Sequence, residues 1–179
     1  MRIIGCGNTD RGDDGAGILV ARRLRELGFD SIEHRGDGFA LLDLWQGSDD
    51  VVLVDAIVSG APPGSVAVWD PLSQKVTAGT AGCSTHGFGP FEAIELGRAL
   101  GRLPLRVRVY GIEAAQFEPG SGTGREVLEA VGRVVAELAS MGSAARNHAA
   151  GESPISCESS PNHCVISRPE KSPDDVVFD

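Results

Sequence analysis

The sequence predicts a single three-layer α/β domain, in which a mostly parallel sheet carries helices on both faces, followed by a disordered tail. Segments of strand character alternate along the chain with segments of helical period. The run Val51-Val52-Leu53-Val54 is apolar throughout, as expected of a parallel strand that is buried on both faces. In addition, 179 residues suffice for one domain that buries its own core.

The first part of the chain predicts a strand, a helix and a second strand. Arg2–Cys6 is a short apolar run that ends at a glycine, which is typical of a strand. In Ala16–Leu27 the apolar residues share one helical face, arginines fill the other, and Gly28 ends the helix. Ser31–Arg35 follows as the second predicted strand.

The middle of the chain predicts a short helix, the central strand and a strand after a turn. Phe39–Trp45 has apolar residues at helical spacing, and Val51–Val54 is the central strand. The Pro62-Pro63-Gly64 turn leads into Ser65–Trp69, a strand that could run antiparallel to the others. Small and polar residues then form a predicted loop over Pro71–Thr85.

The remaining elements are a helix, a strand and a longer helix. Phe91–Leu100 follows a proline, which suits a first helical turn, and a glycine comes after it. Leu105–Tyr110 is the last predicted strand, and Arg125–Ser140 is the last predicted helix. The spacing of Thr123 and Glu126 before its apolar stripe predicts a capping box.

The character of the sequence changes after Met141. Serine, proline, asparagine and charged residues dominate, without helical or strand period. We therefore predict a domain over residues 1–141 and a disordered tail over residues 142–179. The tail contains a His163-Cys164 pair, two residue types that bind metals, but we interpret it as a tail without a site.

Composition excludes several function classes. A net charge of −9 argues against binding to nucleic acid or to anionic lipid. No apolar run approaches the roughly 20 residues of a membrane-spanning helix. The start Met1–Gly5 is too short an apolar run for a signal peptide, so we expect a cytoplasmic protein. The four cysteines, which are Cys6, Cys83, Cys157 and Cys164, predict neither a disulfide framework nor a CxxC zinc site.

Acidic residues crowd the loop after the first strand, where a doubly wound sheet binds its ligands. A dinucleotide fingerprint would need glycine at Asp10, and only Arg11 opposes Asp10, Asp13 and Asp14. This loop should therefore repel phosphate and attract a cation. We expect Asp13 to cap the following helix, which leaves Asp14 available for a ligand; alternatively, Asp13 or Asp14 only caps the helix and complements its dipole.

Two further residues are predicted to face the same crevice. Asp55 directly follows the central strand, which should lie next to the first strand, and His86 lies in a glycine-rich loop just before a helix. With Asp14 they suit a divalent ion of the zinc or nickel type. The alternatives are a carboxylate bonded to loop amides and a structural histidine. A thiol protease with Cys83 and His86 is another alternative, although nothing in the sequence activates Cys83.

The ordered motifs of residues 1–141 resemble those of the hydrogenase maturation endopeptidases. They are Gly5-x-Gly7-Asn8, Asp13-Asp14-Gly15-x-Gly17, Val54-Asp55-Ala56, Thr85-His86-Gly87, Tyr110-Gly111-Ile112-Glu113 and Phe117-Glu118-Pro119-Gly120. The resemblance implies a twisted sheet and an aspartyl-type endopeptidase. Such an enzyme removes a C-terminal peptide from the large-subunit precursor of a [NiFe] hydrogenase after nickel insertion.

The resemblance also implies residue roles. Its nickel-contacting positions fall on Asp14, Asp55 and His86; the nickel would arrive in the precursor, and other divalent metals such as zinc or cadmium could occupy the same site. Asp37 is displaced by one residue from the acid of the family's second turn, which weakens any role for it. Two mechanisms stay open: an ion that polarises the scissile carbonyl or activates water, and an ion that only positions the peptide while a carboxylate acts as base. A non-proteolytic nickel-sensing scaffold for the large subunit and a metal-dependent hydrolase of small molecules are the alternative functions.

Overall fold

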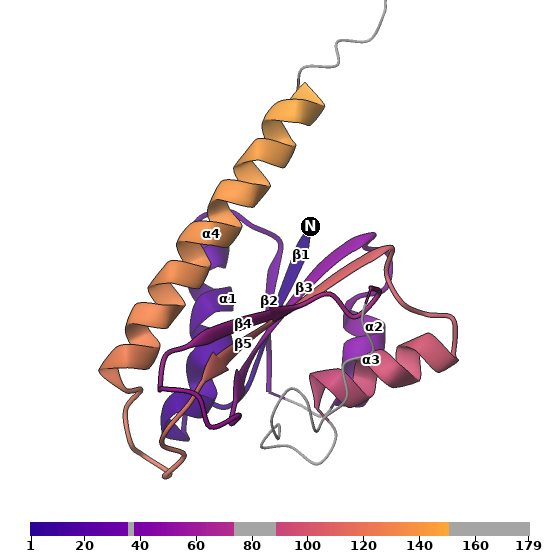
Figure 1. Ribbon diagram of the computed structural model, residues 1–179. Helices are drawn as coiled ribbons and strands as arrows, with labels where there is room; N and C mark the ends of the chain where they lie inside the picture. The colour runs from indigo at the N-terminus through magenta and orange to yellow at the C-terminus, as the bar shows by residue number, and fades with distance from the viewer. Residues whose placement is uncertain (36–37, 74–88, 151–179) are drawn as a thin grey trace, which may run out of the picture.

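The computed structural model describes residues 1–35, 38–73 and 89–150, which contain a five-stranded sheet (Figure 1). The strand order is β2-β1-β3-β5-β4. The strands are β1 (Arg2–Cys6), β2 (Ser31–His34), β3 (Asp50–Ile57), β4 (Val66–Trp69) and β5 (Arg106–Glu113). All neighbours are parallel except β4, which runs antiparallel to β5. The predicted mostly parallel sheet is therefore confirmed, and β4 is the antiparallel strand that the sequence left open.

Helices cover both faces of the sheet, which confirms the three layers. They are the short 3-10 helix η1 (Gly12–Gly15), α1 (Ala16–Glu26), α2 (Gly38–Leu44), α3 (Pro90–Ala99) and α4 (Arg125–Ala150). Helices α1 and α4 pack together on one face, and α2 and α3 pack together on the other (Figure 1). Each face has its own apolar cluster, and all residues of β3 after Asp50 are buried between them. This is the burial that the apolar run Val51–Val54 predicted.

Several element ends differ from the prediction. Strands β3 and β5 each continue three residues further, to Ile57 and Glu113, because they pair with each other along eight residues. The predicted capping box is wrong, since the Thr123 hydroxyl donates to the Gly12 carbonyl oxygen at 3.2 Å. Helix α4 instead starts with a bond from the Leu128 N–H to the Gly124 carbonyl oxygen.

Helix α4 ends at Ala150, ten residues later than the predicted helix, and so extends into the predicted tail. The alanines of residues 142–150 are good helix formers, although these residues lack the apolar stripe on which the prediction depended. Gly142 also packs on the Phe29 ring, where a Cβ would lie 2.4 Å from the nearest ring carbon. The rest of the predicted tail, with its His163-Cys164 pair, lies outside the described residues. No helix among the residues described here is both long and apolar enough to span a membrane.

The packing of α4 on β5 perturbs Tyr110, the only tyrosine of the chain. Its hydroxyl donates to Glu137 Oε1 at 2.8 Å. Burial, followed by this hydrogen bond and the Glu137 charge, raises the pKa of Tyr110 to about 12. Because the folded pKa lies above the unfolded value of about 10, the contribution of Tyr110 to stability is complete below pH 10 and is lost between about pH 10 and 12.

We therefore expect the near-ultraviolet absorbance of the native protein to show one tyrosine transition near pH 12. The urea-unfolded chain should titrate near pH 10 and serves as the reference. Glu137→Gln should lower the native value, because the acceptor loses its charge. A native transition near pH 10 would contradict the buried Tyr110–Glu137 contact.

Candidate active site

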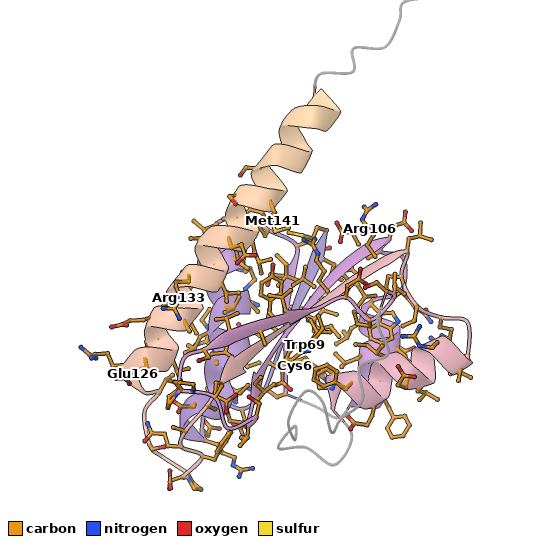
Figure 2. All side chains as sticks on the ribbon, viewed as in Figure 1. Cys6, Trp69, Arg106, Glu126, Arg133 and Met141 are labelled. Atoms are coloured by element: carbon orange, nitrogen blue, oxygen red, sulfur yellow. The ribbon has the colours of Figure 1, made fainter. Side chains whose placement is uncertain are left out.

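The candidate site lies where β1 and β3 end side by side. Their last paired residues are Gly5 and Val54, so Cys6 and Asp55 come next on neighbouring strands. Helix α1 starts directly on this pair: a Cβ on Gly17 would lie 2.2 Å from the Val54 carbonyl oxygen and 2.4 Å from that of Cys6. Only glycine permits this approach. In Figure 2, Cys6 marks this end of the sheet, and Arg106 marks the opposite end.

Asp14 lies in η1, immediately before α1, and its side chain is fully buried. The loop folds tightly: the Asn8 N–H donates to the Asp14 carbonyl oxygen at 3.1 Å, and the Asp14 N–H donates to that of Arg11. Because η1 contacts β3, the fold brings Asp14 to the strand end that carries Asp55. Asp10 is exposed and forms an ion pair with Arg35 at 3.5 Å, so Arg11 is not the only cation that opposes the loop acids.

Asp55 is buried, with 2% of its surface exposed. It pairs in register with Gly111 on β5, and on the other side it lies next to Cys6. Burial, followed by the negative charge of Asp55, raises the pKa of the Cys6 thiol well above its usual value. Cys6 is therefore a neutral thiol beside Asp55 rather than a nucleophilic thiolate.

An aromatic pair links Asp55 to the start of α3. A Cβ on Gly111 would lie 2.7 Å from the Trp69 ring, so the indole covers the residue that pairs with Asp55. The Trp69 and Phe91 rings then meet edge to face, with centroids 5.4 Å apart. Phe91 is the second residue of α3, and it follows His86 by five positions.

The structure thus brings two of the three predicted site residues to one end of the sheet. His86, together with Cys83 and Asp37, lies outside the described residues. Within residues 1–35, 38–73 and 89–150, no three His, Cys, Asp or Glu side chains are grouped so that they could hold a metal ion. The predicted metal set, which needs His86, stays a prediction.

Asp13 has a different role from the predicted one. No side chain caps α1, so the expected helix cap is wrong. The buried Asp13 carboxylate instead accepts hydrogen bonds from the backbone N–H groups of Ala115, Gln116 and Gly124, at 2.9, 3.1 and 2.7 Å. It therefore ties the loop that holds Asp14 to the connection between β5 and α4.

Asp13→Asn should lower the free energy of unfolding by about 2–4 kcal/mol, measured in urea. Both carboxylate oxygens of Asp13 accept hydrogen bonds from backbone N–H groups. In asparagine an NH₂ group replaces one of these oxygens, so it would face backbone donors without being able to accept from them. Asp10→Asn in the same loop is the matched control, and its cost should stay within about 0.5 kcal/mol because Asp10 is exposed. Equal stability of the two variants would refute this account of Asp13.

Glu113 is part of a sequence motif that does not by itself indicate a role for its carboxylate. Glu113 ends β5 and is buried, with 2% exposure. Its carboxylate accepts bonds from the Ser59 N–H and hydroxyl group and from the Gly60 N–H, all between 2.7 and 3.1 Å. It therefore holds the turn that follows β3. The available sequence signal was the position of Glu113, an acidic residue at the end of a strand that neighbours the central strand.

A family model for hydrogenase maturation proteases matches residues 32–141 of this sequence. The chain belongs to the hydrogenase maturation protease family. This confirms the resemblance found in the motifs, and the matched segment runs from within β2 to within α4.

Solved structures of family members share the fold. The maturation protease HybD from Thermococcus kodakarensis is 26% identical, with a TM-score of 0.63 over 79% of this chain and 99% of that chain. The maturation protease HycI from Thermococcus kodakarensis KOD1 is 27% identical, with a TM-score of 0.59 over 78% of this chain and 90% of that chain. The curated Protein FrxA of Pyrococcus furiosus is 33% identical over 87 residues, which are 48% of this chain and span 61% of that protein's length.

Proposed function

We propose that this family member is an endopeptidase that removes the C-terminal extension of a [NiFe] hydrogenase large-subunit precursor after nickel insertion. The observation that carries the proposal is the pair of buried carboxylates, Asp14 and Asp55, at the carboxyl end of the sheet in a chain of this family. Parallel α/β sheets bind their ligands at this end. Burying two acids there costs stability, and bringing a cation to them offsets that cost.

We further propose that Asp14, Asp55 and His86 contact the nickel that the precursor carries. Carboxylate oxygens and an imidazole nitrogen suit nickel, zinc and cadmium as ligands. Trp69 and Phe91 support the inclusion of His86, because their contact holds the start of α3 against the row of Asp55 and Gly111. The buried thiol of Cys6 is a poor nucleophile, so we propose that water attacks the scissile carbonyl and that a carboxylate takes its proton.

The decisive experiment is to incubate the protein with nickel-loaded precursor and to measure the precursor's mass. Loss of a single C-terminal peptide, with no loss from nickel-free precursor, is the expected result. An unchanged mass together with a stable complex would overturn the protease and support the nickel-sensing scaffold. Hydrolysis of small amide substrates without action on the precursor would support the small-molecule hydrolase.

The carboxylate pair predicts metal-dependent stability. Nickel, zinc or cadmium at a hundredfold excess over its dissociation constant should stabilise the wild type by about 2.7 kcal/mol through mass action. The double variant Asp14→Asn with Asp55→Asn should lose this rise in melting temperature. Its stability without metal should not fall, because two neutral amides no longer repel each other.

Asp49→Asn, just before the opposite end of β3, should keep the full metal response and is the control. If the isolated wild type shows no shift, the site needs the precursor's own ligands to hold the ion. Processing that survives both substitutions would show that the assignment of these carboxylates is wrong.

A further inference from the structure

We propose that the outer edge of β4 docks the precursor, whose extended C-terminal segment pairs with Val66 and Val68 as an additional strand. This inference rests on the proposed function, because it concerns how that substrate is held. We call the outward backbone groups of Val66 and Val68 the β4 edge.

The register shows which backbone groups point outward. The Glu113 N–H donates to the Ser65 carbonyl oxygen at 2.8 Å, so the carbonyl group of Ser65 faces β5, while the Ser65 N–H donates to the Pro62 carbonyl oxygen. Alternation along an antiparallel pair then turns Ala67 and Trp69 toward β5 as well. The N–H and C=O groups of Val66 and Val68 therefore face away from the sheet. Neither residue has a hydrogen-bond partner on that side among residues 1–35, 38–73 and 89–150.

The two edges of the sheet differ in how they are protected. Natural edge strands are usually protected against pairing by charged side chains, proline or a covering segment. On the β2 edge, Glu33 binds the guanidinium groups of Arg22 and Arg25. Strand β4 reads Val-Ala-Val-Trp, without charge or proline, and the Val68 side chain is 50% exposed. No charge, proline or covering segment protects this edge within residues 1–35, 38–73 and 89–150, and such an edge suits an extended chain, which supplies alternating donors and acceptors at strand spacing.

The β4 edge is continuous with the candidate site. Ala67, Gly111 and Asp55 form one row across β4, β5 and β3. Strands lie about 4.8 Å apart, so an added strand would lie three spacings, or about 14 Å, from Asp55 on β3, a span that about four extended residues cover. A peptide that pairs with β4 can therefore reach the site with its scissile bond about four residues further along.

The connection between β3 and β4 holds this edge in a fixed place. Glu113 binds the Ser59–Gly60 turn. A Cβ on Gly64, whose φ is +77°, would lie 2.3 Å from the Glu126 carbonyl oxygen of α4. The Arg133 guanidinium also donates to the Gly64 carbonyl oxygen at 2.7 Å. The edge is thus preorganised relative to Asp55, which lowers the entropic cost of docking a peptide.

The test uses the full-length protein and synthetic peptides with the sequence of the precursor's C-terminal segment on both sides of the cleavage site. Single N-methyl groups, moved one residue at a time along the peptide, delete one N–H each. The dissociation constant should rise about three- to tenfold at every second residue over four positions, because alternate N–H groups face the edge strand. The affected positions should begin about four residues from the scissile bond.

A pair of variants tests the protein side. Val68→Pro deletes one outward N–H without touching the bonds to β5, and it should raise the KM for precursor about three- to tenfold with little change in kcat. Val68→Thr keeps the N–H and the branched shape, and it should behave as wild type. Since the peptide scan uses unaltered protein, it stands even if Val68→Pro fails to fold.

The outcomes separate this inference from the proposed function. Cleavage of nickel-loaded precursor, without any alternating N-methyl effect on peptide binding, overturns the docking mode and leaves the protease intact. An alternating effect on peptide binding, with nickel-loaded precursor left uncleaved, supports the docking mode and overturns the protease. Concentration-dependent dimers that Val68→Pro abolishes would instead assign the edge to a second copy of this chain and overturn the proposal.

Discussion

Asp55→Asn should abolish precursor processing while the protein stays folded. Asparagine has the shape of aspartate but neither its charge nor its basicity, and Asp55 lies buried where β3 meets the candidate site. A lost general base or ion contact should lower the rate by a factor on the order of 100 to 10,000. The initial rate of precursor mass loss, together with the thermal unfolding curve, measures both parts of this expectation.

Asp50→Asn is the matched control, because Asp50 starts the same strand at its opposite end. There it forms ion pairs with Arg106 and Arg108 at 3.6 and 3.4 Å, far from the proposed chemistry. Its processing rate should equal that of the wild type. The same rate in Asp55→Asn would remove Asp55 from the mechanism.

His86→Ala should have an effect as large as that of Asp55→Asn. The expectation rests on the Thr85-His86-Gly87 motif and on the packing of Phe91, five residues later, against Trp69. The variant should still unfold cooperatively, because the substitution removes only the imidazole ring. Processing at the wild-type rate would show that the histidine takes no part.

Gly17→Ala should lower the free energy of unfolding by about 3 kcal/mol or more. In an ordinary helix this change stabilises by up to about 1 kcal/mol, because alanine is the better helix former. Here the new Cβ would lie 2.2 and 2.4 Å from the backbone oxygens of Val54 and Cys6. These atoms belong to the ladder between β1 and β3 and cannot move aside, so overpacking outweighs helix propensity.

Gly132→Ala in α4 is the matched control for the sign of this effect. Gly132 is also inside a helix, but nothing lies within 4 Å of its added Cβ. We expect a gain of about 0.5–1 kcal/mol in urea unfolding. If the two variants changed stability in the same direction, the close approach of α1 to the sheet would be refuted.

The sequence by itself determined the elements, the layers and the end of the sheet that carries the two candidate carboxylates. Continuous apolar character marks β3 as buried on both faces, and one-sided periodicity marks α1 as a surface helix. These are local patterns, because burial acts on each side chain in turn. The position of Asp55 after the central strand follows from the same pattern. The motifs around it led to the family, which the family model confirms.

The tertiary structure alone decided the partners of the polar side chains and the ends of the elements. The Asp13 carboxylate binds N–H groups about a hundred residues away, and Glu113 binds a turn more than fifty residues before it. Such long-range bonds leave no pattern in the local sequence, because a carboxylate that caps a helix and one that binds distant N–H groups are the same chemical group. Strands β3 and β5 extend to Ile57 and Glu113 because each strand provides the backbone hydrogen-bonding partners of the other. Helix α4 passes its predicted end because Gly142 fits against Phe29, a contact between segments that only the fold brings together.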